Sequence, residues 1–383
     1  MVLPGEMNVR SETVQKARQL LSTFRKKNEQ RFKFEYIIGE GSHGFTTRFK
    51  ARIMEVDESG PPLSVPKIER FVMKRSILAH EEHLIQREID VLGALQDSEH
   101  IQQLYWIKGE PRASYISYVK GPSLLTHWVE NGTLLDMIQD RLPEWNGPLP
   151  NRLLWGVFFC LVRMLVAMAW DGEERPPRDS SGQPLPETGR VHGDFQSGNI
   201  LIGDFDPDEH SLFPGLVLFD FGSSNELSDG KPPSTASKTN IFNAGRVMIE
   251  LIGGTVKCSG KMKIDTEAGE ETIQSYARDL DGLNSVYKVP TAIANRQKQK
   301  LANLDPDLRS LIARCLANDI KKRPNLEDLY DEVERNVEEK QQKDYAGKAS
   351  HKNESNGGVR NVAKELMVLQ DIKSSLSALQ INK

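Results

Sequence analysis

Hydrophobic and polar positions follow two different patterns along the chain, and the change between them falls near residue 120. Before that point, runs rich in β-branched and aromatic residues, typical of strands, are separated by glycines and turn segments: 32–41, 45–56, 70–77, 102–107 and 113–119. Apolar residues at helical spacing occupy 11–27 and 79–95. The first part of the chain is therefore predicted to be strand-rich, with two helices.

After residue 122 helical patterns dominate, and they occupy three segments: 153–170, 240–252 and 305–338. Two short apolar runs at 199–203 and 215–221 are typical of strands. The segment 171–190 is rich in proline, glycine, serine and charge, which indicates a surface loop. The second part is therefore predicted to be mainly helical, and the chain as a whole to be α+β.

The end of the chain changes character again. Residues 338–358 are polar and nearly free of apolar anchors, which predicts a flexible linker. Beyond it, seven apolar residues recur on one helical face: Val359, Val362, Leu366, Leu369, Ile372, Leu376 and Leu379. Such a helix either docks on its own domain or binds a partner, and the pattern leaves both interpretations open.

Composition narrows the class of protein. The chain has 383 residues, a mass of 43.2 kDa and a formal net charge of −4, which argues against a nucleic-acid-binding protein. Its three cysteines are widely separated, so a disulfide framework is not expected. We find no apolar run typical of a secretory signal, and 155–170 is interrupted by Arg163 and is short for a membrane span. We expect an intracellular protein, cytoplasmic or nuclear, without a membrane partner.

The first chemical motif is the glycine-rich segment Gly39, Gly41 and Gly44 between two predicted strands. Glycines in such a hairpin allow the backbone to approach phosphate groups closely and to donate N–H groups to them. No helix follows, so a dinucleotide-binding fingerprint is not indicated. Taken alone, this segment is equally typical of a simple turn.

A lysine and a glutamate form the second motif. Lys74 ends an apolar strand run, where lysine is disfavoured unless it is paired, and Glu88 follows inside the predicted helix 79–95. A Lys–Glu pair that bridges strand and helix would direct the ammonium group at phosphate oxygens.

Three oxygen-bearing side chains form the remaining motifs. Asp194 and Asn199 lie in the segment 192–199, His-Gly-Asp-Phe-Gln-Ser-Gly-Asn, and Asp220 begins Asp-Phe-Gly after an apolar strand run. Carboxylate and amide oxygens on loops beside short strands suit a magnesium–nucleotide site, because Mg²⁺ takes few protein ligands together with phosphates and water.

Together, and in this order, these motifs resemble those of the eukaryotic protein-kinase superfamily over residues 32–338, about four-fifths of the chain. The resemblance implies a bilobal fold with a small antiparallel-sheet N-lobe and a mainly helical C-lobe. The expected domains are a helical extension at 1–30, the N-lobe at 31–119, the C-lobe at 120–338, and the linker and amphipathic helix at 339–383.

The resemblance also implies ATP and Mg²⁺ as cofactors and a protein as substrate. The glycine-rich segment would cover ATP, Lys74 would hold its phosphates with Glu88 as partner, and Leu201 would pack on adenine. The segment 116–124 resembles the inter-lobe hinge, with backbone groups of Ser117 and Val119 for adenine. Asp194 would orient or deprotonate the acceptor hydroxyl, while Asn199 and Asp220 would hold the metal.

Several positions depart from the family pattern. Gly193 stands where most members have arginine, and Gln196 where serine/threonine kinases have a lysine that contacts the γ-phosphate. The segment 223–239 lacks Ala-Pro-Glu, so Arg323 has lost its expected glutamate. Asn240 replaces an aspartate that normally holds the catalytic loop. Without an arginine at 193, we expect any activity to be independent of phosphorylation in 223–239.

The motifs favour a divergent serine/threonine protein kinase that transfers the γ-phosphate of ATP to a hydroxyl. Two alternatives stay open because of these departures. One is a nucleotide-binding pseudokinase scaffold, and the other is a small-molecule kinase of the aminoglycoside or choline type, which shares the His-Gly-Asp loop. The C-terminal helix is a candidate site for a partner.

Overall fold

The computed structural model describes residues 3–27, 29–41, 44–53, 67–227, 230, 232–254, 256, 259–266, 269–281 and 301–369. The chain forms two compact units. Unit 1 comprises Met1–Asp97, Gln102–Trp128 and Asp220–Gly222, and unit 2 comprises Ser98–Ile101, Val129–Phe219 and Ser223–Lys383.

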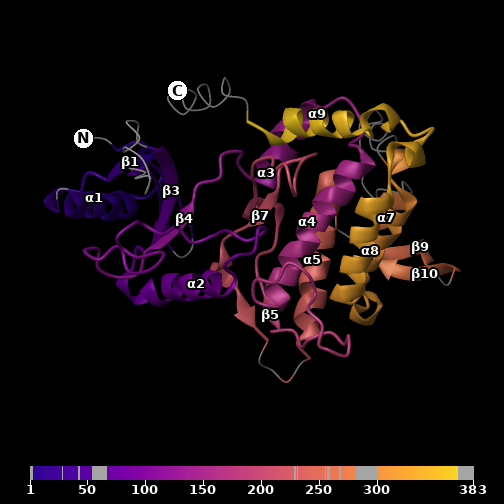
Figure 1. The fold of residues 1–383 in the computed structure, drawn as a ribbon, viewed down its shortest axis with the longest axis horizontal. Coiled ribbons are helices and arrows are strands. Elements are labelled where there is room, and N and C mark those ends of the chain that lie inside the picture. Colours follow the sequence, from indigo (N-terminus) through magenta and orange to yellow (C-terminus); the bar gives the residue numbers. More distant parts are fainter. Residues whose placement is uncertain are drawn as a thin grey trace, which may run out of the picture. The chain divides into compact units, whose positions relative to one another are not determined.

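Unit 1 contains a four-stranded antiparallel sheet in the order β1-β2-β3-β4 (Figure 1). Its strands are β1 (Phe32–Gly41), β2 (Gly44–Ile53), β3 (Lys67–Arg75) and β4 (Leu124–His127). The first three match the predicted runs. The strands predicted at 102–107 and 113–119 do not form, apart from a single bridge between Leu104 and Thr126. Ser114 adopts a left-handed conformation (φ 54°), which breaks an extended run, and the fourth strand forms later in the chain.

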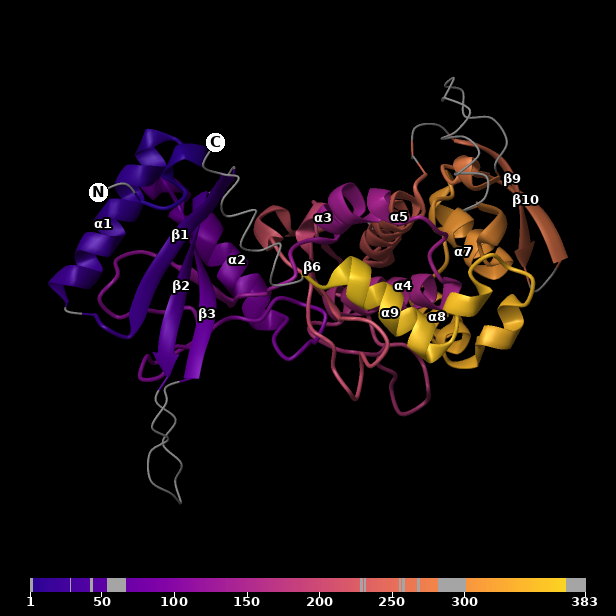
Figure 2. The ribbon, with the colours of Figure 1, turned by 90° about the horizontal axis from the view of Figure 1, so that it is seen from above.

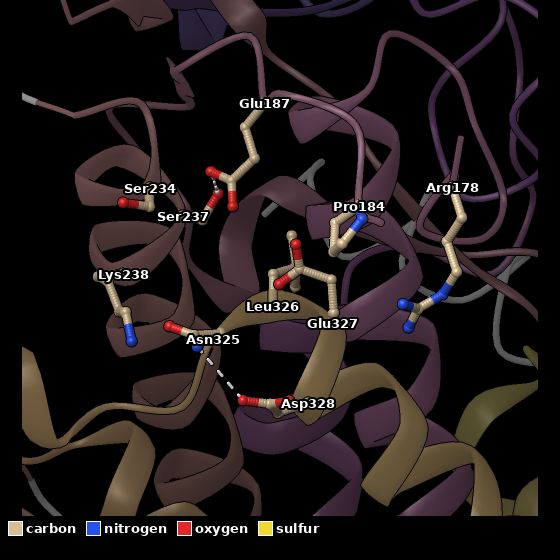
Figure 3. A pocket seen from close by; sticks show the side chains of 10 residues that line it. All are labelled: Arg178, Pro184, Glu187, Ser234, Ser237, Lys238, Asn325, Leu326, Glu327 and Asp328. Atoms are coloured by element: carbon tan, nitrogen blue, oxygen red, sulfur yellow. Dashed lines mark hydrogen bonds between the residues drawn. The ribbon is translucent and has the colours of Figure 1, made fainter. Parts of the chain in front are cut away.

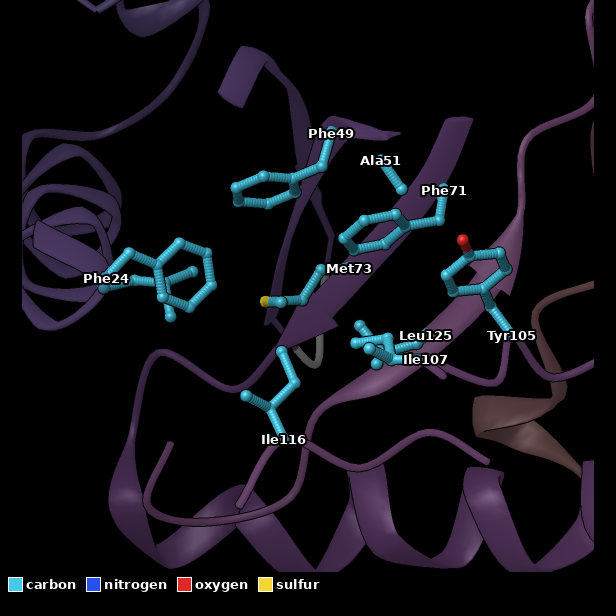
Figure 4. Close-up of a cluster of buried hydrophobic side chains, with 10 residues drawn as sticks. Phe24, Phe49, Ala51, Phe71, Met73, Tyr105, Ile107, Ile116 and Leu125 are labelled. Carbon is cyan, nitrogen blue, oxygen red and sulfur yellow. The ribbon is translucent and has the colours of Figure 1, made fainter. Parts of the chain in front are cut away.

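Two helices complete unit 1, α1 (Ser11–Lys26) and α2 (Glu82–Ala94), with short 3₁₀ turns η1 (Glu6–Asn8) and η2 (Ala79–Glu81). The helix α1 inserts Phe24 into a cluster of buried aromatic side chains that includes Phe49 and Phe71 (Figure 4). The ring centroids of Phe24 and Phe49 are 5.6 Å apart, and those of Phe49 and Phe71 are 5.3 Å apart. The N-terminal helix is thus part of the hydrophobic core of unit 1.

Unit 2 is mainly helical (Figures 1 and 2). Its α-helices are α3 (Leu134–Asp136), α4 (Asn151–Ala169), α5 (Ser234–Ile252), α7 (Pro306–Cys315), α8 (Leu326–Glu339) and α9 (Asn356–Met367). Short turns are η3 (Met137–Arg141), η4 (Leu142–Glu144), η5 (Ser197–Asn199), η7 (Arg278–Asp281), η8 (Ile320–Lys322), η9 (Gln342–Tyr345) and η10 (His351–Asn353), and η6 (Phe221–Ser223) begins in unit 1.

Three two-stranded ribbons accompany these helices. They are β5 (Arg190–Val191) with β8 (Asn225–Glu226), β6 (Ile200–Ile202) with β7 (Leu216–Leu218), and β9 (Gly260–Thr266) with β10 (Gly269–Ser275). The four-stranded antiparallel sheet followed by a mostly helical region confirms the α+β prediction and is consistent with a bilobal kinase-like fold.

The core of unit 2 is built around α4, which contacts α5, α8 and α9. By length and composition alone, this 19-residue helix could cross a membrane, so the sequence-based expectation that it is too short does not hold. Its most apolar window is 89% buried inside the fold, which accounts for a helix that is hydrophobic all round. As evidence for a membrane span it is therefore weak.

The linker predicted at 339–358 is instead folded against unit 2. Tyr345 is buried, and its hydroxyl donates to Asp305 at 2.9 Å. The fully buried carboxylate of Glu354 accepts the backbone N–H groups of Asn151 and Arg152, at 2.7 and 3.0 Å, at the start of α4. The prediction of a flexible linker is wrong because its polar side chains have partners elsewhere in unit 2.

The helix that follows docks on its own unit over the part that the structure describes. Val359, Val362 and Leu366 of α9 are buried, and Ser355 caps the helix by accepting the N–H of Gly358. Leu369 continues the chain beyond α9, and its N–H donates to Asn131 at 3.0 Å. The last predicted apolar positions, Ile372, Leu376 and Leu379, lie outside the described residues.

Candidate active site

Unit 1 brings together three of the predicted site residues. The Nζ atom of Lys74, on β3, lies 2.9 Å from the carboxylate of Glu88, on α2, and 2.7 Å from that of Asp220. Glu88 is only 2% exposed, whereas the side chain of Asp220 is 40% exposed. One carboxylate therefore anchors the lysine from inside the unit, and the other reaches solvent.

The charges in this group favour an ionised lysine. Burial by itself lowers the pKa of Lys74, but the charges of Glu88 and Asp220 outweigh that effect and raise the pKa above its usual value. Lys74 is therefore a fixed cation, suited to binding an anion.

Asp220 has an unusual backbone conformation, with φ 62°. Left-handed geometry is uncommon outside glycine, although aspartate tolerates it better than most residues. Such a conformation costs about 1 kcal/mol or more and is typical of functional sites. The backbone thus places this carboxylate beside Lys74 at some cost to stability.

The three predicted glycines have different surroundings. A Cβ on Gly44 would lie 2.1 Å from the backbone oxygen of Arg75, so the packing of β2 on β3 requires glycine there. No described atom lies within 4 Å of a Cβ built on Gly39 or Gly41. The space above these two glycines is therefore open to a ligand, as far as the described residues show, while Ser42 and His43 lie outside them.

In unit 2, amide side chains hold Asp194. Asn199 donates from Nδ2 to its Oδ2 atom at 2.7 Å, and Gln196 donates from Nε2 to its Oδ1 atom at 2.9 Å. Asp194 is exposed, and Asn199 is buried. The glutamine that replaces the usual lysine thus orients the predicted catalytic aspartate.

Asn240, on α5, holds the backbone just before this loop. Its Oδ1 atom accepts the N–H of His192 at 3.3 Å, and its Nδ2 donates to the carbonyl of Arg190 at 2.9 Å. An aspartate could supply only the first of these two bonds. The amide is therefore matched to this backbone rather than being a weakened aspartate.

Replacing Asn240 with aspartate is expected to destabilise unit 2, although the family usually has aspartate there. The carbonyl of Arg190 would lose its donor and face a carboxylate in a buried site, which costs about 1–3 kcal/mol. Denaturant unfolding of Asn240→Asp measures this loss. Asn318→Asp, the same change at an exposed position of unit 2, serves as the control, with an expected change of less than about 0.5 kcal/mol. A stabilised Asn240→Asp would contradict the assigned bonds.

Gly193 is required by its surroundings. Its φ is 82°, and a Cβ at this position would lie 2.3 Å from the backbone oxygen of Ser223. No side chain, including the usual arginine, fits without moving the backbone. The missing arginine thus follows from a close contact between the loop before Asp194 and the segment after the Asp-Phe-Gly motif.

The predicted hinge lies elsewhere than expected. The chain passes from unit 1 to unit 2 between Trp128 and Val129, after β4, so Ser117 and Val119 lie within unit 1. Their N–H groups already have acceptors, because Ser117 donates to Glu110 at 2.9 Å and Val119 donates to the carbonyl of Ile116 at 3.0 Å. Placing the hinge at these two residues was therefore wrong.

The sequence does contain a signal for the true crossover. The apolar run that forms β4 is followed by Gly132 and by Thr133, whose side chain makes a capping box with Asp136 at the start of α3. A strand, a glycine and a capped helix start mark a boundary.

The predicted adenine-contacting residue Leu201 lies in unit 2. It is half-buried on β6, where it pairs with Val217 of β7.

Arg323 has found other partners in place of the missing glutamate. Its guanidinium donates to the carbonyls of Ala317 and Lys238, both at 3.0 Å, and lies over the ring of Phe242 at 4.5 Å from the centroid. In return, the Nζ atom of Lys238 donates to the carbonyl of Arg323. These bonds tie the start of α5 to the segment before α8.

The segment 223–239, whose phosphorylation we expect not to matter for activity, is partly helical. Ser234, Ser237 and Thr239 lie in α5, which begins earlier than the predicted residue 240. The hydroxyl of Ser237 donates to Glu187 at 2.6 Å, and that of Thr239 to the carbonyl of Thr235 at 2.9 Å. These two hydroxyls are therefore engaged inside the fold.

A polar pocket of about 310 Å³ lies beside this helix start (Figure 3). Glu187 and Glu327 supply carboxylates, and Lys238 and Arg178 supply positive charges. Burial raises the pKa of Glu187, although the Ser237 hydroxyl opposes the rise. None of the sequence-predicted site residues lines this pocket.

Comparison with known proteins agrees with the sequence motifs. No protein-family model matches the chain. A receptor-interacting serine/threonine-protein kinase 3 from Rattus norvegicus is 23% identical over 302 residues, which cover 76% of this chain and 53% of that protein. A serine/threonine-protein kinase-like protein from Arabidopsis thaliana is 20% identical over 326 residues, 79% of this chain and 83% of that protein.

The similarity is to protein kinases. At this level of identity it supports a protein-kinase-like superfamily, and the chain spans about half the length of the rat relative.

Proposed function

We propose that this protein is an ATP-dependent phosphotransferase, a divergent serine/threonine protein kinase that transfers the γ-phosphate to a protein hydroxyl. The observation that carries the proposal is the Lys74 ammonium group held between Glu88 and Asp220. A protein substrate follows from the same kinase-like interpretation, and the intracellular location expected from the composition also belongs to the proposal.

In unit 1, Lys74 would bind the phosphates of the nucleotide. Its ammonium group is already oriented by the buried Glu88, so little side-chain entropy is lost when an anion binds. Gly39 and Gly41, with open space above them, would allow backbone N–H groups to approach the phosphates.

In unit 2, Asp194 would accept a hydrogen bond from the acceptor hydroxyl and take its proton as the bond to phosphorus forms. The amides of Asn199 and Gln196 hold the carboxylate in one orientation, which favours a positioning role. Asn240 and Gly193 support this geometry through the backbone before and within the loop.

Each unit contains one of the two predicted ligands of Mg²⁺. The partly exposed carboxylate of Asp220 and the amide oxygen of Asn199 are hard oxygen ligands of the kind that Mg²⁺ prefers. When bound, Mg²⁺ neutralises charge on the phosphates of the nucleotide. Because the chain crosses between the units after Trp128, we propose that the backbone after Trp128, rather than that of Ser117 and Val119, binds adenine. Leu201 would contribute apolar contact.

Replacing Lys74 with alanine is expected to weaken Mg-ATP binding by about 10–100-fold, since a charge-assisted hydrogen bond contributes about 1.5–3 kcal/mol. Calorimetric titration measures this change. The control is Lys33→Ala, an exposed lysine of β1 in the same sheet, which is expected to leave affinity unchanged. Asp220→Asn provides a second test, because its side chain is partly exposed and its removal disturbs packing less. Unchanged affinity in both site variants would overturn the proposed site.

Phosphate transfer itself is tested with γ-labelled Mg-ATP on wild type and Asp194→Asn. Labelling of the protein itself or of protein substrates, abolished in the variant, supports the proposal. Transfer only to small alcohols or amines would instead identify a small-molecule kinase.

A nucleotide-binding scaffold is the second candidate, favoured by one observation. Position 196, where serine/threonine kinases have a lysine that contacts the γ-phosphate, holds a glutamine whose amide donates to Asp194 instead. The transferred phosphate would therefore lack a positive charge that stabilises the transition state. Tight Mg-ATP binding without any transfer would select this function.

A further inference from the structure

Three metal-ligating side chains meet in the core of unit 2, and none of them is among the residues assigned to phosphate transfer. They are His100, on the segment before unit 1 resumes, Cys160 on α4, and His210 on the loop between β6 and β7. Their ligand atoms all lie within 4.8 Å of one another. The rings of His100 and His210 are perpendicular, with centroids 5.2 Å apart.

Three of the four histidine ring nitrogens in this cluster lack hydrogen-bond partners among the described residues. His100 is 1% exposed, and its Nδ1 lies 2.8 Å from the carbonyl of Leu216, so Nδ1 carries the proton. The Nε2 atom of His100 therefore presents a lone pair, and it has no partner. His210 is 9% exposed, and neither of its ring nitrogens has a partner.

Buried nitrogens without partners are costly, at about 1–3 kcal/mol each, and native proteins usually satisfy them. The arrangement of His100 is the one that metal-binding histidines show, since one ring nitrogen donates to a backbone carbonyl and the other is left for the metal. The free lone pair on Nε2 of His100 therefore lies close to the thiol of Cys160 and the imidazole of His210.

We propose that His100, Cys160 and His210 bind Zn²⁺ in the core of unit 2. Two imidazoles and a thiolate are ligands that Zn²⁺ prefers. Zinc–ligand distances of about 2.0–2.3 Å place the ligand atoms of a tetrahedral site roughly 3.5 Å apart. The present separations therefore require only a small inward rotation of the side chains, and the fourth position goes to an oxygen ligand.

The charge balance beside the cluster accommodates a cation despite a nearby arginine. Arg163, on the same helix as Cys160, pairs with Glu174 at 2.6 Å, Glu209 at 3.0 Å and Glu99 at 3.3 Å. Three carboxylates around one guanidinium leave two surplus negative charges. A zinc–thiolate unit, with a net charge of +1, would reduce the repulsion among these carboxylates.

Zinc coordinates neutral imidazole nitrogens and a thiolate. The Nε2 atom of His100 already presents a lone pair, and binding of Zn²⁺ displaces the proton of the Cys160 thiol, which is released to solvent. The site would join three segments that are far apart in the chain.

The test uses the full chain stripped of metal with a chelator and then titrated with Zn²⁺ alone, or with Co²⁺ as a spectroscopic probe. We expect about one metal ion per chain, a thiolate-to-cobalt charge-transfer band in the near ultraviolet, and a rise in Tm on adding Zn²⁺. Cys160→Ser is expected to lose the band and at least tenfold in affinity. The control Cys315→Ser, at the other buried free cysteine of the described chain, is expected to keep both.

If Cys160→Ser does not fold, His210→Gln on the loop replaces it, with the same expected loss of affinity. Absence of stoichiometric binding by wild type overturns the proposal whatever the variants do. Binding without a thiolate band also overturns it, because the metal would then lie elsewhere. The result is independent of Mg-ATP binding, which Lys74→Ala reports separately.

Discussion

Glu354→Ala is expected to lower the free energy of unfolding of unit 2 by about 3–5 kcal/mol, because several buried donors lose their acceptor at once and each costs about 1–3 kcal/mol. The substitution leaves the N–H groups of Asn151 and Arg152 without their acceptor at the buried start of α4. It also removes an acceptor from the hydroxyl of Ser350 and from the amide of Asn151.

Thermal unfolding should show this loss as a Tm lower by about 10 °C, given roughly 2–4 °C per kcal/mol for a unit of this size. Glu365→Ala is the matched control, since it removes the same group from an exposed position on α9, and its expected effect is within about 0.5 kcal/mol. Truncation after residue 340 should be at least as damaging as Glu354→Ala. A truncated chain with wild-type stability would show that the segment after 340 is dispensable and that these bonds contribute nothing.

Gly193→Arg, which restores the residue most common in the kinase family, is expected to destabilise unit 2 and to abolish phosphate transfer. The left-handed backbone costs a non-glycine residue about 1–3 kcal/mol, and overpacking against Ser223 adds a similar amount. The loop that carries Asp194 would have to shift.

Alanine separates the two causes. Gly193→Ala introduces only a Cβ, and Gly182→Ala does the same at a nearly identical φ of +83° with no described atom within 4 Å. Gly182→Ala should therefore cost only the backbone strain, whereas Gly193→Ala should cost clearly more in denaturant unfolding. Equal costs at the two positions would mean that the contact with Ser223 is unimportant.

Much of the fold could be predicted because its elements have strong local patterns. The runs at 32–41, 45–56 and 70–77 became β1–β3, and the helix at 153–170 became α4. The fourth strand could not be predicted in the same way. The segments 113–119 and 124–127 are both apolar, and only the left-handed turn at Ser114 and the pairing with β3 distinguish them.

The ribbon of β9 and β10 was not foreseen, although Met262 and Ile264 alternate with polar residues and both are buried. Its strands are short and strongly charged. Alternation over so few apolar positions is a weak signal until a partner strand and the helix α7, which contacts β9, are known.

The candidate site was partly foreseen through motifs. Lys74 and Glu88 meet as the spacing suggested, and Asp194 lies beside Asn199. The need for glycine at 193 depends on a carbonyl thirty residues later, and no local pattern records it. The cluster of His100, Cys160 and His210 is equally invisible, because its members are far apart and form no ligand-spacing motif.

The cap of α4 by Glu354 has a consequence for how the chain is made. Synthesis proceeds from the N-terminus, and Glu354 is added 203 residues after Asn151. During that interval the apolar segment of α4 has already been synthesised, but its first N–H groups lack the carboxylate of Glu354 as acceptor. Unit 2 therefore completes its folding only after residue 354 has been synthesised, and until then α4 is exposed to non-native contacts. A premature stop codon anywhere before residue 354 would leave the first N–H groups of α4 without this acceptor.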